Sequence, residues 1–202
     1  MRYDWVWVGI GNPGSEYDTT RHNAGFLALD ALKERFQDTL EESKKWEKKY
    51  NAFVSVLFFQ EFKVLLCKPL SYVNRSGAVV SSILKMFNIP LDHVVVFHDE
   101  LELDFGVLKW KTGGGHKGHN GLRNISELCG SDYNRFCIGI GRPRGAVEVS
   151  KFVLSSFTPK ELEILNVFVF PCMHRALPYL FQGKFDKIHE ISKDVYSNSE
   201  SF

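Results

Sequence analysis

The stretch GIGNPGSEYDTTRHNAG, residues 9–25, decides how the first part of the chain folds. It follows a short apolar strand signal at Trp5–Val8 and leads into an amphipathic helical pattern that begins near Ala24. A plain connection between two such elements is usually about 4–6 residues long. This loop is longer, and it carries polar side chains that include one imidazole: Asn12, Tyr17, Arg21, His22 and Asn23. A long loop of that composition indicates a functional site.

The same stretch matches the dinucleotide-binding pattern G-x-G-x-x-G at residues 9–14. That interpretation requires a helix that opens within the glycines and an acidic residue about 20 residues further on, at the end of the second strand. Here Pro13-Gly14 is typical of a turn, and the helical pattern starts well after it. The next strand signal, Ala52–Phe59, has no terminal acid of that kind. The sequence therefore argues against a nicotinamide or flavin site.

The rest of the chain alternates between strand and helix signals. Further strands are predicted at Lys63–Lys68, Val94–His98, Val107–Lys111 and Phe136–Ile140, and helices at Ala24–Phe36, Gly77–Phe87, Gly121–Leu128 and Lys160–Phe181. The last helix starts with a capping box at Thr158–Glu161, and Pro171 and Pro178 are expected to kink or divide it. Gln60-Glu61 is typical of a tight hairpin turn.

Hairpin and crossover connections in one chain predict an α/β fold, a single domain in which a central mixed β-sheet is flanked by helices on both faces. We expect this domain to cover residues 1–195, with a surface connection at 37–49 and a flexible tail at 196–202.

The composition is that of an ordinary globular domain: 202 residues, 44% hydrophobic and 24% charged, with a net charge of +1. No apolar run approaches the roughly 18 residues of a membrane helix, and the N-terminus lacks a signal-peptide layout. The four cysteines lie in apolar contexts without paired spacing, which predicts reduced thiols in a cytosolic protein. The run 106–124 has four cations and no carboxylate, so it is a candidate phosphate-binding face or a solvated loop.

Polar residues recur where predicted strands end, and the carboxyl ends of strands are where open α/β sheets bind ligands. They are Asn12, His22, Asn74, His98, Asp99, His116, His119 and Asn120. Each also has a structural interpretation. Asn74 and Asn120 could cap helices, His22 could be a surface cap, and Asp99 could stabilise a turn.

The residue types favour water as the nucleophile. There is no G-x-S-x-G elbow, and the apolar surroundings of the cysteines disfavour a thiolate. A histidine is the natural base near neutral pH, and Asp99 suits the role of fixing its tautomer. Asparagine amides can bind a peptide main chain or donate to an oxyanion.

A metal held by His98, His116 and His119 is the alternative, which the glycine-rich context disfavours.

Together these motifs resemble the bacterial-type peptidyl-tRNA hydrolase family. The matching blocks are GIGNPGSEYDTTRHNAGF (9–26), KPLSYVNRSG (68–77), HDELELDFG (98–106), GGGHKGHNGLRNI (113–125) and IGIGRP (138–143). They follow the family's order over most of the chain, and the set is far more specific than any one block. The resemblance implies hydrolysis of the ester between a peptide and the 3′-terminal ribose of tRNA, by a cytoplasmic monomer without a metal or organic cofactor and without membrane attachment.

The resemblance also implies a role for each matched residue. His22 would be the general base, Asp99 its orienting partner, and Asn120 would position water or stabilise the oxyanion. Asn12 would be the fourth catalytic residue and, together with Asn74, would hold the peptide main chain and the reacting carbonyl. The substrate-binding residues would be Asn74, Tyr17 and Tyr72 in the walls of the site, His119 for the tRNA 3′ end, and Lys109 and Lys111 for phosphates.

Two positions depart from the family pattern. Val73 stands where the family often has Met, and the shorter side chain could reshape the peptide pocket. Cys137 stands where the family often has an Arg that helps grip the tRNA 5′-phosphate, and Arg135 or Arg142 could substitute for it. Two other functions stay open: an RNA-binding protein on this scaffold without hydrolysis, and a general esterase or aminopeptidase whose rate would be insensitive to salt.

Overall fold

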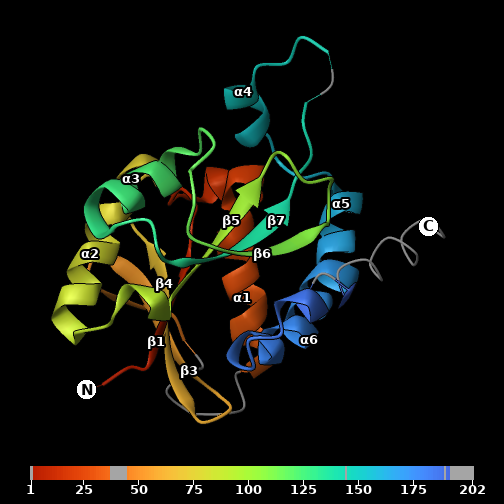
Figure 1. The fold of residues 1–202 in the computed structure, drawn as a ribbon. Coiled ribbons are helices and arrows are strands. Elements are labelled where there is room, and N and C mark those ends of the chain that lie inside the picture. The colour runs from red at the N-terminus through yellow and green to blue at the C-terminus, as the bar shows by residue number, and fades with distance from the viewer. Residues whose placement is uncertain (1, 37–44, 144, 189, 192–202) are drawn as a thin grey trace.

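The computed structural model describes residues 2–36, 45–143, 145–188 and 190–191. Within them, a seven-stranded sheet with the order β2-β3-β4-β1-β5-β7-β6 forms the centre of the molecule (Figure 1). The strands are β1 (Trp5–Gly9), β2 (Glu47–Lys49), β3 (Ala52–Phe59), β4 (Phe62–Pro69), β5 (Val94–Glu100), β6 (Leu108–Thr112) and β7 (Asn134–Gly139). The middle pairs β1–β4, β1–β5 and β5–β7 are parallel, and the outer pairs are antiparallel. The carboxyl ends of the four parallel strands therefore share one edge of the sheet.

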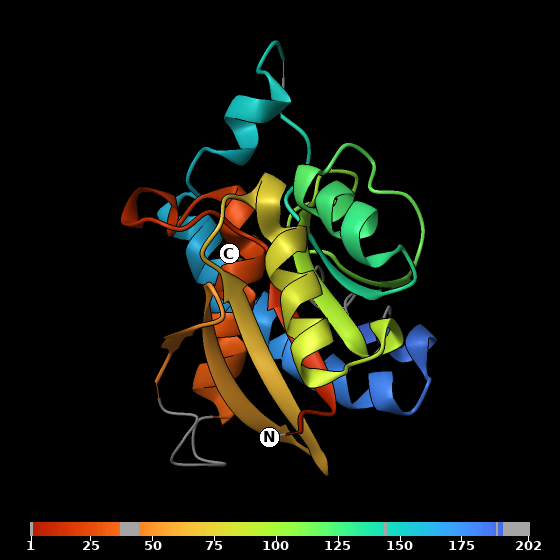
Figure 2. The same cartoon turned by 90° about the vertical axis from the view of Figure 1, so that its left-hand side faces the viewer.

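Helices cover both faces of the sheet, as expected for this α/β class (Figures 1 and 2). One face carries α1 (Ala24–Phe36) and a C-terminal run of α5 (Pro159–Ile164), the π-helical turn η7 (Leu165–Val169) and α6 (Phe170–Phe181). The other carries α2 (Ser76–Phe87) and α3 (Asn120–Cys129). The short helix α4 (Val149–Val153) stands at the top of the molecule in Figure 1.

The alternation of side chains along β1 builds a core on each face. Trp7 joins Leu29 of α1 and Met173 of α6 in one cluster of fully buried residues. Val8 joins Ile83 of α2 in the other. Strands that are buried on both faces read as continuous apolar runs, which is why their positions could be predicted from the sequence.

Two glycines of the stretch 9–25 allow α1 to approach the central strands closely. A Cβ on Gly25 would lie 2.2 Å from the carbonyl oxygen of Phe97 in β5, and one on Gly9 would lie 2.5 Å from the carbonyl oxygen of Gly25. Neither position has room for a side chain. Gly9 therefore serves the packing of helix against sheet, which accounts for its place in the G-x-G-x-x-G pattern.

The predicted elements are present, with ends that shift by at most two residues. β2, which lies inside the connection predicted at 37–49, and α4 were not predicted. The predicted helix Lys160–Phe181 is divided by η7, which ends two residues before Pro171. Pro171 has no N–H to bond to the preceding turn, so the helix changes its hydrogen-bond pattern there. Residues 37–44 and the predicted tail at 196–202 lie outside the described residues.

One helical run corrects the expectation that no apolar run approaches the length of a membrane helix. Pro159–Phe181 is 23 residues long and contains an 18-residue window with a mean hydropathy of 1.3, so it is long and apolar enough to cross a membrane by these two criteria. One side of the run packs into the core, because Leu165, Val169, Met173 and Leu177 are fully buried in the cluster beneath α1. The helix was predicted, but the charged capping box and the two prolines interrupt its apolar pattern in the sequence.

Candidate active site

The predicted site residues come from loops and strand ends at the carboxyl edge of the parallel strands. The loop after β1 contains the 3-10 turns η1 (Ser15–Tyr17) and η2 (Arg21–Asn23), and the loop after β4 contains η5 (Val73–Arg75). Asp99 lies within the last residues of β5 instead of after the strand, and α3 begins at Asn120. Short turns thus bring residues that are far apart in the sequence to one place, as expected for this fold.

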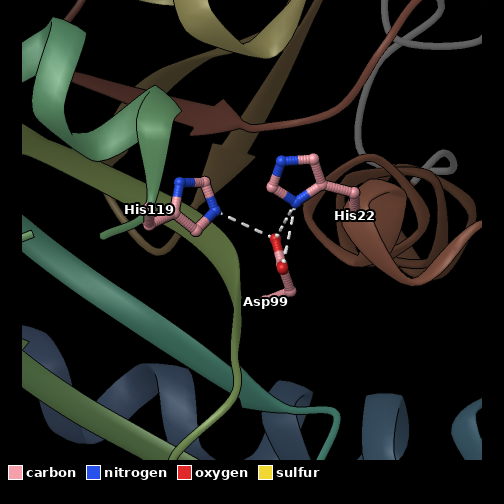
Figure 3. Close-up of side chains that lie close together, drawn as sticks. All are labelled: His22, Asp99 and His119. Atoms are coloured by element: carbon pink, nitrogen blue, oxygen red, sulfur yellow. Dashed lines mark hydrogen bonds and ion pairs between the residues drawn. The ribbon is translucent and has the colours of Figure 1, made fainter. Parts of the chain in front are cut away.

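His22 and His119 both contact the carboxylate of Asp99 (Figure 3). His22 Nδ1 lies 3.0 Å from each carboxylate oxygen, and His119 Nε2 lies 3.0 Å from Oδ1. A carboxylate accepts hydrogen bonds, so both of these ring nitrogens donate. Nε2 of His22 therefore keeps its lone pair, and in Figure 3 it lies on the side of the ring away from Asp99. This is the arrangement that a general base needs.

The tautomer of His119 is fixed by hydrogen bonds to its other ring nitrogen, Nδ1. The backbone N–H groups of Gly121 and Leu122 donate to His119 Nδ1 over 3.1 and 3.3 Å, which makes His119 the N-cap of α3. Nδ1 must then be the acceptor and Nε2 must carry the hydrogen. The structural interpretation of Asn120 as the cap was therefore wrong, and so was that of Asn74, because Arg75 occupies the N-cap position of α2.

The electrostatics of the pair follow from burial and charge. Asp99 is 3% exposed. Burial alone would raise the pKa of Asp99, but His22 and His119 outweigh it and hold that pKa well below its ordinary value. Burial lowers the pKa of His22, but the Asp99 carboxylate raises it by more, through its charge and the hydrogen bond. A buried anion thus steadies the imidazolium that forms when His22 takes a proton.

The pair faces a cleft made of two adjoining hollows. The first, about 320 Å³, is lined by His22, Asp99, His116, His119 and Glu102, among others. The second, about 360 Å³, is lined by the predicted peptide-side residues Asn12, Tyr17, Tyr72, Val73 and Asn74. Asn120 and His22 line both hollows, as do Ser150 and Val153 of α4. His22 therefore sits where the two hollows meet.

Asn12 is oriented by the loop that contains it. Its backbone N–H donates to Asn23 Oδ1 over 2.8 Å, and Asn23 Nδ2 donates to the Asn12 carbonyl over 3.0 Å. The side-chain oxygen of Asn12 accepts from the Val73 backbone N–H over 3.0 Å. The amide hydrogens of Asn12 are thereby left for the cleft that it lines.

The predicted phosphate-contacting lysines lie apart from these hollows. Lys109 and Lys111 are on β6, opposite Cys137 and Arg135 of β7, and neither lysine lines the cleft. Arg135 is buried and donates to the Gly114 and Gly115 carbonyls, so it cannot take the place of the family arginine.

Arg142, the other candidate substitute, lines the cleft and pairs with Glu102.

The alternative metal set is not assembled. Among the described residues, His22, Asp99 and His119 form the group whose ligand atoms converge, within 4.8 Å. His119 would have to give up its Nε2 hydrogen to bind a cation there, and the ring would then present a hydrogen to the two α3 amides. His98 donates from Nδ1 to the Asp99 carbonyl and is buried. The cluster fits a hydrogen-bond network better than a metal site.

Sequence reasoning missed the ion pair that anchors the His22 turn. Both terminal nitrogens of Arg21 lie 2.9 Å from the Glu161 carboxylate, across 140 positions in the sequence. The Arg21 guanidinium also lies 4.7 and 5.0 Å from the ring centroids of Phe152 and Phe157. A bidentate pair of this kind holds the turn η2, which contains His22.

Glu161→Gln is expected to lower the free energy of unfolding by about 1–2 kcal/mol, because it neutralises one partner of a largely buried charge-assisted pair. Glutamine can still accept the capping bond from the Thr158 N–H, so the effect reports on Arg21. Urea denaturation measures it. Glu148→Gln is the matched control, since its pair with Lys151 is exposed and should be worth less than about 0.5 kcal/mol. Equal effects of the two substitutions would contradict the anchoring role.

Fold and cleft together define a class: a single-domain α/β protein that presents a histidine–carboxylate pair to water at the carboxyl ends of parallel strands. Comparison with known proteins gives the family. The family model described as peptidyl-tRNA hydrolase matches residues 6–199. The chain therefore belongs to the peptidyl-tRNA hydrolase family, which confirms the resemblance seen in its motifs.

Relatives and solved structures agree with this assignment. The chain is 47% identical over 150 residues to a peptidyl-tRNA hydrolase of Ehrlichia ruminantium, which covers 74% of this chain and 75% of that protein. It is 40% identical over 166 residues to that of Streptomyces avermitilis, covering 82% of both chains. The crystal structure of the Acinetobacter baumannii peptidyl-tRNA hydrolase superposes with a TM-score of 0.77 at 34% identity, covering 96% of this chain and 95% of that one.

Proposed function

We propose that this enzyme hydrolyses the ester between a peptide and the 3′-terminal ribose of tRNA, and that it recycles tRNA from prematurely released peptidyl-tRNA. The observation that carries the proposal is the His22–Asp99 pair at the junction of the two hollows. Membership of the peptidyl-tRNA hydrolase family supports the substrate. An ester needs less protonation of its leaving group than an amide does, so a base with oxyanion donors suffices.

The proposed reaction uses water and no covalent intermediate. His22 Nε2 takes a proton from water while Nδ1–H donates to Asp99, and the water oxygen attacks the ester carbonyl. The carbonyl oxygen becomes an oxyanion, which Asn120 and Asn12 stabilise through their amide hydrogens. When the C–O bond to the ribose breaks, the imidazolium returns the proton to the leaving 3′-oxygen. These steps require side chains and water alone, without a cofactor.

We propose that the peptide occupies the hollow lined by Tyr17, Tyr72 and Asn74, and that the tRNA 3′ end occupies the other. Tyr17 and Tyr72 meet edge to face, with ring centroids 6.5 Å apart, and form an apolar wall. His119 then supports the 3′ end while it holds Asp99. Lys109 and Lys111 contact phosphates further along the tRNA, on the exposed side of β6.

We also propose that the protein acts as one domain over residues 1–195, as a cytoplasmic monomer without membrane attachment. The family is one of soluble, translation-related enzymes, which supports the setting. One side of the apolar run Pro159–Phe181, with Leu165, Val169, Met173 and Leu177, packs into the protein's own core, which supports the absence of a membrane anchor.

An assay of tRNA release tests the proposed function. Purified protein incubated with peptidyl-tRNA should produce free tRNA with multiple turnovers, and the rate should fall as salt rises, because the phosphate contacts weaken. Binding without release would instead favour an RNA-binding protein on this scaffold. Turnover of small esters at a rate insensitive to salt would favour a general esterase.

The rate should depend on pH through His22. The neutral imidazole is the active form, so kcat/KM should fall as pH drops through the pKa of His22. That pKa is raised above its ordinary value of 6.5, so the midpoint of the acid limb should lie above 6.5. A profile of kcat/KM from about pH 5 to 9 measures it. A midpoint below 6.5 would contradict the influence of Asp99 on His22.

A further inference from the structure

A buried thiol lies behind Asp99, and the proposed reaction does not use it. Cys137 of β7 stands opposite His98 of β5 in the parallel register, and its Sγ lies 3.3 Å from His98 Nε2. The two residues are 3% and 2% exposed. Burial raises the pKa of the Cys137 thiol to about 12 and lowers the pKa of His98 to about 3. Thiol and imidazole are therefore both neutral in the pH range where the enzyme works.

The direction of the hydrogen bonds through His98 is fixed. His98 Nδ1 lies 2.7 Å from the backbone carbonyl oxygen of Asp99, which can only accept. Nδ1 therefore carries the ring hydrogen, and Nε2 has the lone pair. The Cys137 S–H must then donate to Nε2. A chain of two hydrogen bonds runs from Cys137 through His98 to the main chain of Asp99.

The His98 ring also packs against the ring of His119, the second histidine that contacts the Asp99 carboxylate. The rings of His98 and His119 meet edge to face, with centroids 5.3 Å apart and an interplanar angle of 82°. A rotation of the His98 ring would thus disturb two supports of the carboxylate, the Asp99 peptide and the His119 side chain. The Cys137 thiol contacts this ring at Nε2, the nitrogen that does not bond to Asp99.

We propose that Cys137 is a positioning residue: its thiol holds the His98 ring, which fixes the Asp99 main chain and the His119 ring in the geometry that His22 requires. This inference rests on the proposed hydrolytic function. Cys137 stands where the family often has Arg, and the inference gives this cysteine a structural role in the site that is independent of any contact with RNA.

Paired substitutions test the proposal in the whole protein. Cys137→Ala removes the donor, and we expect kcat for tRNA release to fall about fivefold with KM unchanged. Cys137→Ser should restore kcat, because a hydroxyl donates the same hydrogen bond. Cys67→Ala is the matched control: Cys67 is fully buried in β4 within the apolar core beneath α2, and kcat should not change.

Long-range proton–nitrogen NMR of the histidine rings provides a measurement independent of activity. The unsubstituted protein and Cys137→Ser should show His98 as the Nδ1–H tautomer, with the Nε2 resonance shifted in Cys137→Ala. An Nε2–H tautomer in the unsubstituted protein would overturn the proposal even if the variants fail to fold. So would a Cys137→Ala enzyme with unchanged kcat, a Cys137→Ser enzyme as slow as Cys137→Ala, or an equal loss in Cys67→Ala. An unsubstituted protein that releases no tRNA would defeat the hydrolase proposal instead, and the His98 Nε2 resonance, compared between the unsubstituted protein and Cys137→Ala, would still decide whether the thiol donates to the ring.

Discussion

His22→Ala is expected to lower kcat for tRNA release by about 10²–10⁴-fold, because it removes the Nε2 lone pair that takes the proton from water. The fold should survive. The His22 side chain contributes hydrogen bonds to Asp99, and His119 continues to satisfy one of the carboxylate oxygens. Single-turnover kinetics with saturating enzyme measure the chemical step without a contribution from product release.

His93→Ala is the control for this substitution. His93 precedes β5 at the opposite edge of the sheet, away from the cleft, and its removal should leave kcat unchanged. Near-normal kcat in His22→Ala, with an intact thermal transition, would remove His22 from the role of base.

Asp99→Asn is expected to cost about a thousandfold in kcat, and the structure gives the reason. His119 can only donate through Nε2, because two α3 amides occupy its Nδ1. The oxygen of the new amide must therefore face His119, which places the NH₂ group toward His22 Nδ1. This NH₂ group favours the His22 tautomer that accepts at Nδ1 and carries its hydrogen on Nε2, which cannot act as a base. The base tautomer keeps a single acceptor, Oδ1, which it would share with His119.

The coupling between Asp99 and His22 also predicts the rate of the double variant. If Asp99 acts through His22, a variant with both Asp99→Asn and His22→Ala should be no slower than His22→Ala alone. Asp92→Asn, an exposed acid at the opposite edge, is the control and should leave kcat unchanged. Additive losses in the double variant would mean that Asp99 contributes by another route.

The strands and the position of the site could be predicted from the sequence because their signals are local. β1 is an apolar run with the predicted bounds, since a strand buried on both faces leaves a continuous pattern. β3 also has its predicted bounds, although it exposes Phe53 and Phe58. Asn12, His22, Asn74, Asp99 and Asn120 were named from their place after strand signals and from the family motifs, and the cleft brings them together.

The roles that could not be predicted depend on contacts that leave no local pattern. His119 caps α3 with an imidazole nitrogen, whereas capping rules point to Asn120, the next residue. Arg135 was a candidate substitute for the family arginine, yet it is buried and donates to the Gly114 and Gly115 carbonyls. The bond between Arg21 and Glu161 joins residues that only the folded chain brings together. Tertiary packing decides each of these, and composition does not encode it.

In the proposed mechanism, His22 takes the proton from water while its Nδ1–H is held by Asp99. The most direct test is an NMR titration of the His22 ring, compared with the acid limb of kcat/KM measured in the same buffers. We predict an Nδ1–H tautomer at high pH and a His22 pKa above 6.5 that coincides with the kinetic midpoint. An Nε2–H tautomer, or a His22 pKa that differs from the kinetic midpoint, would contradict it.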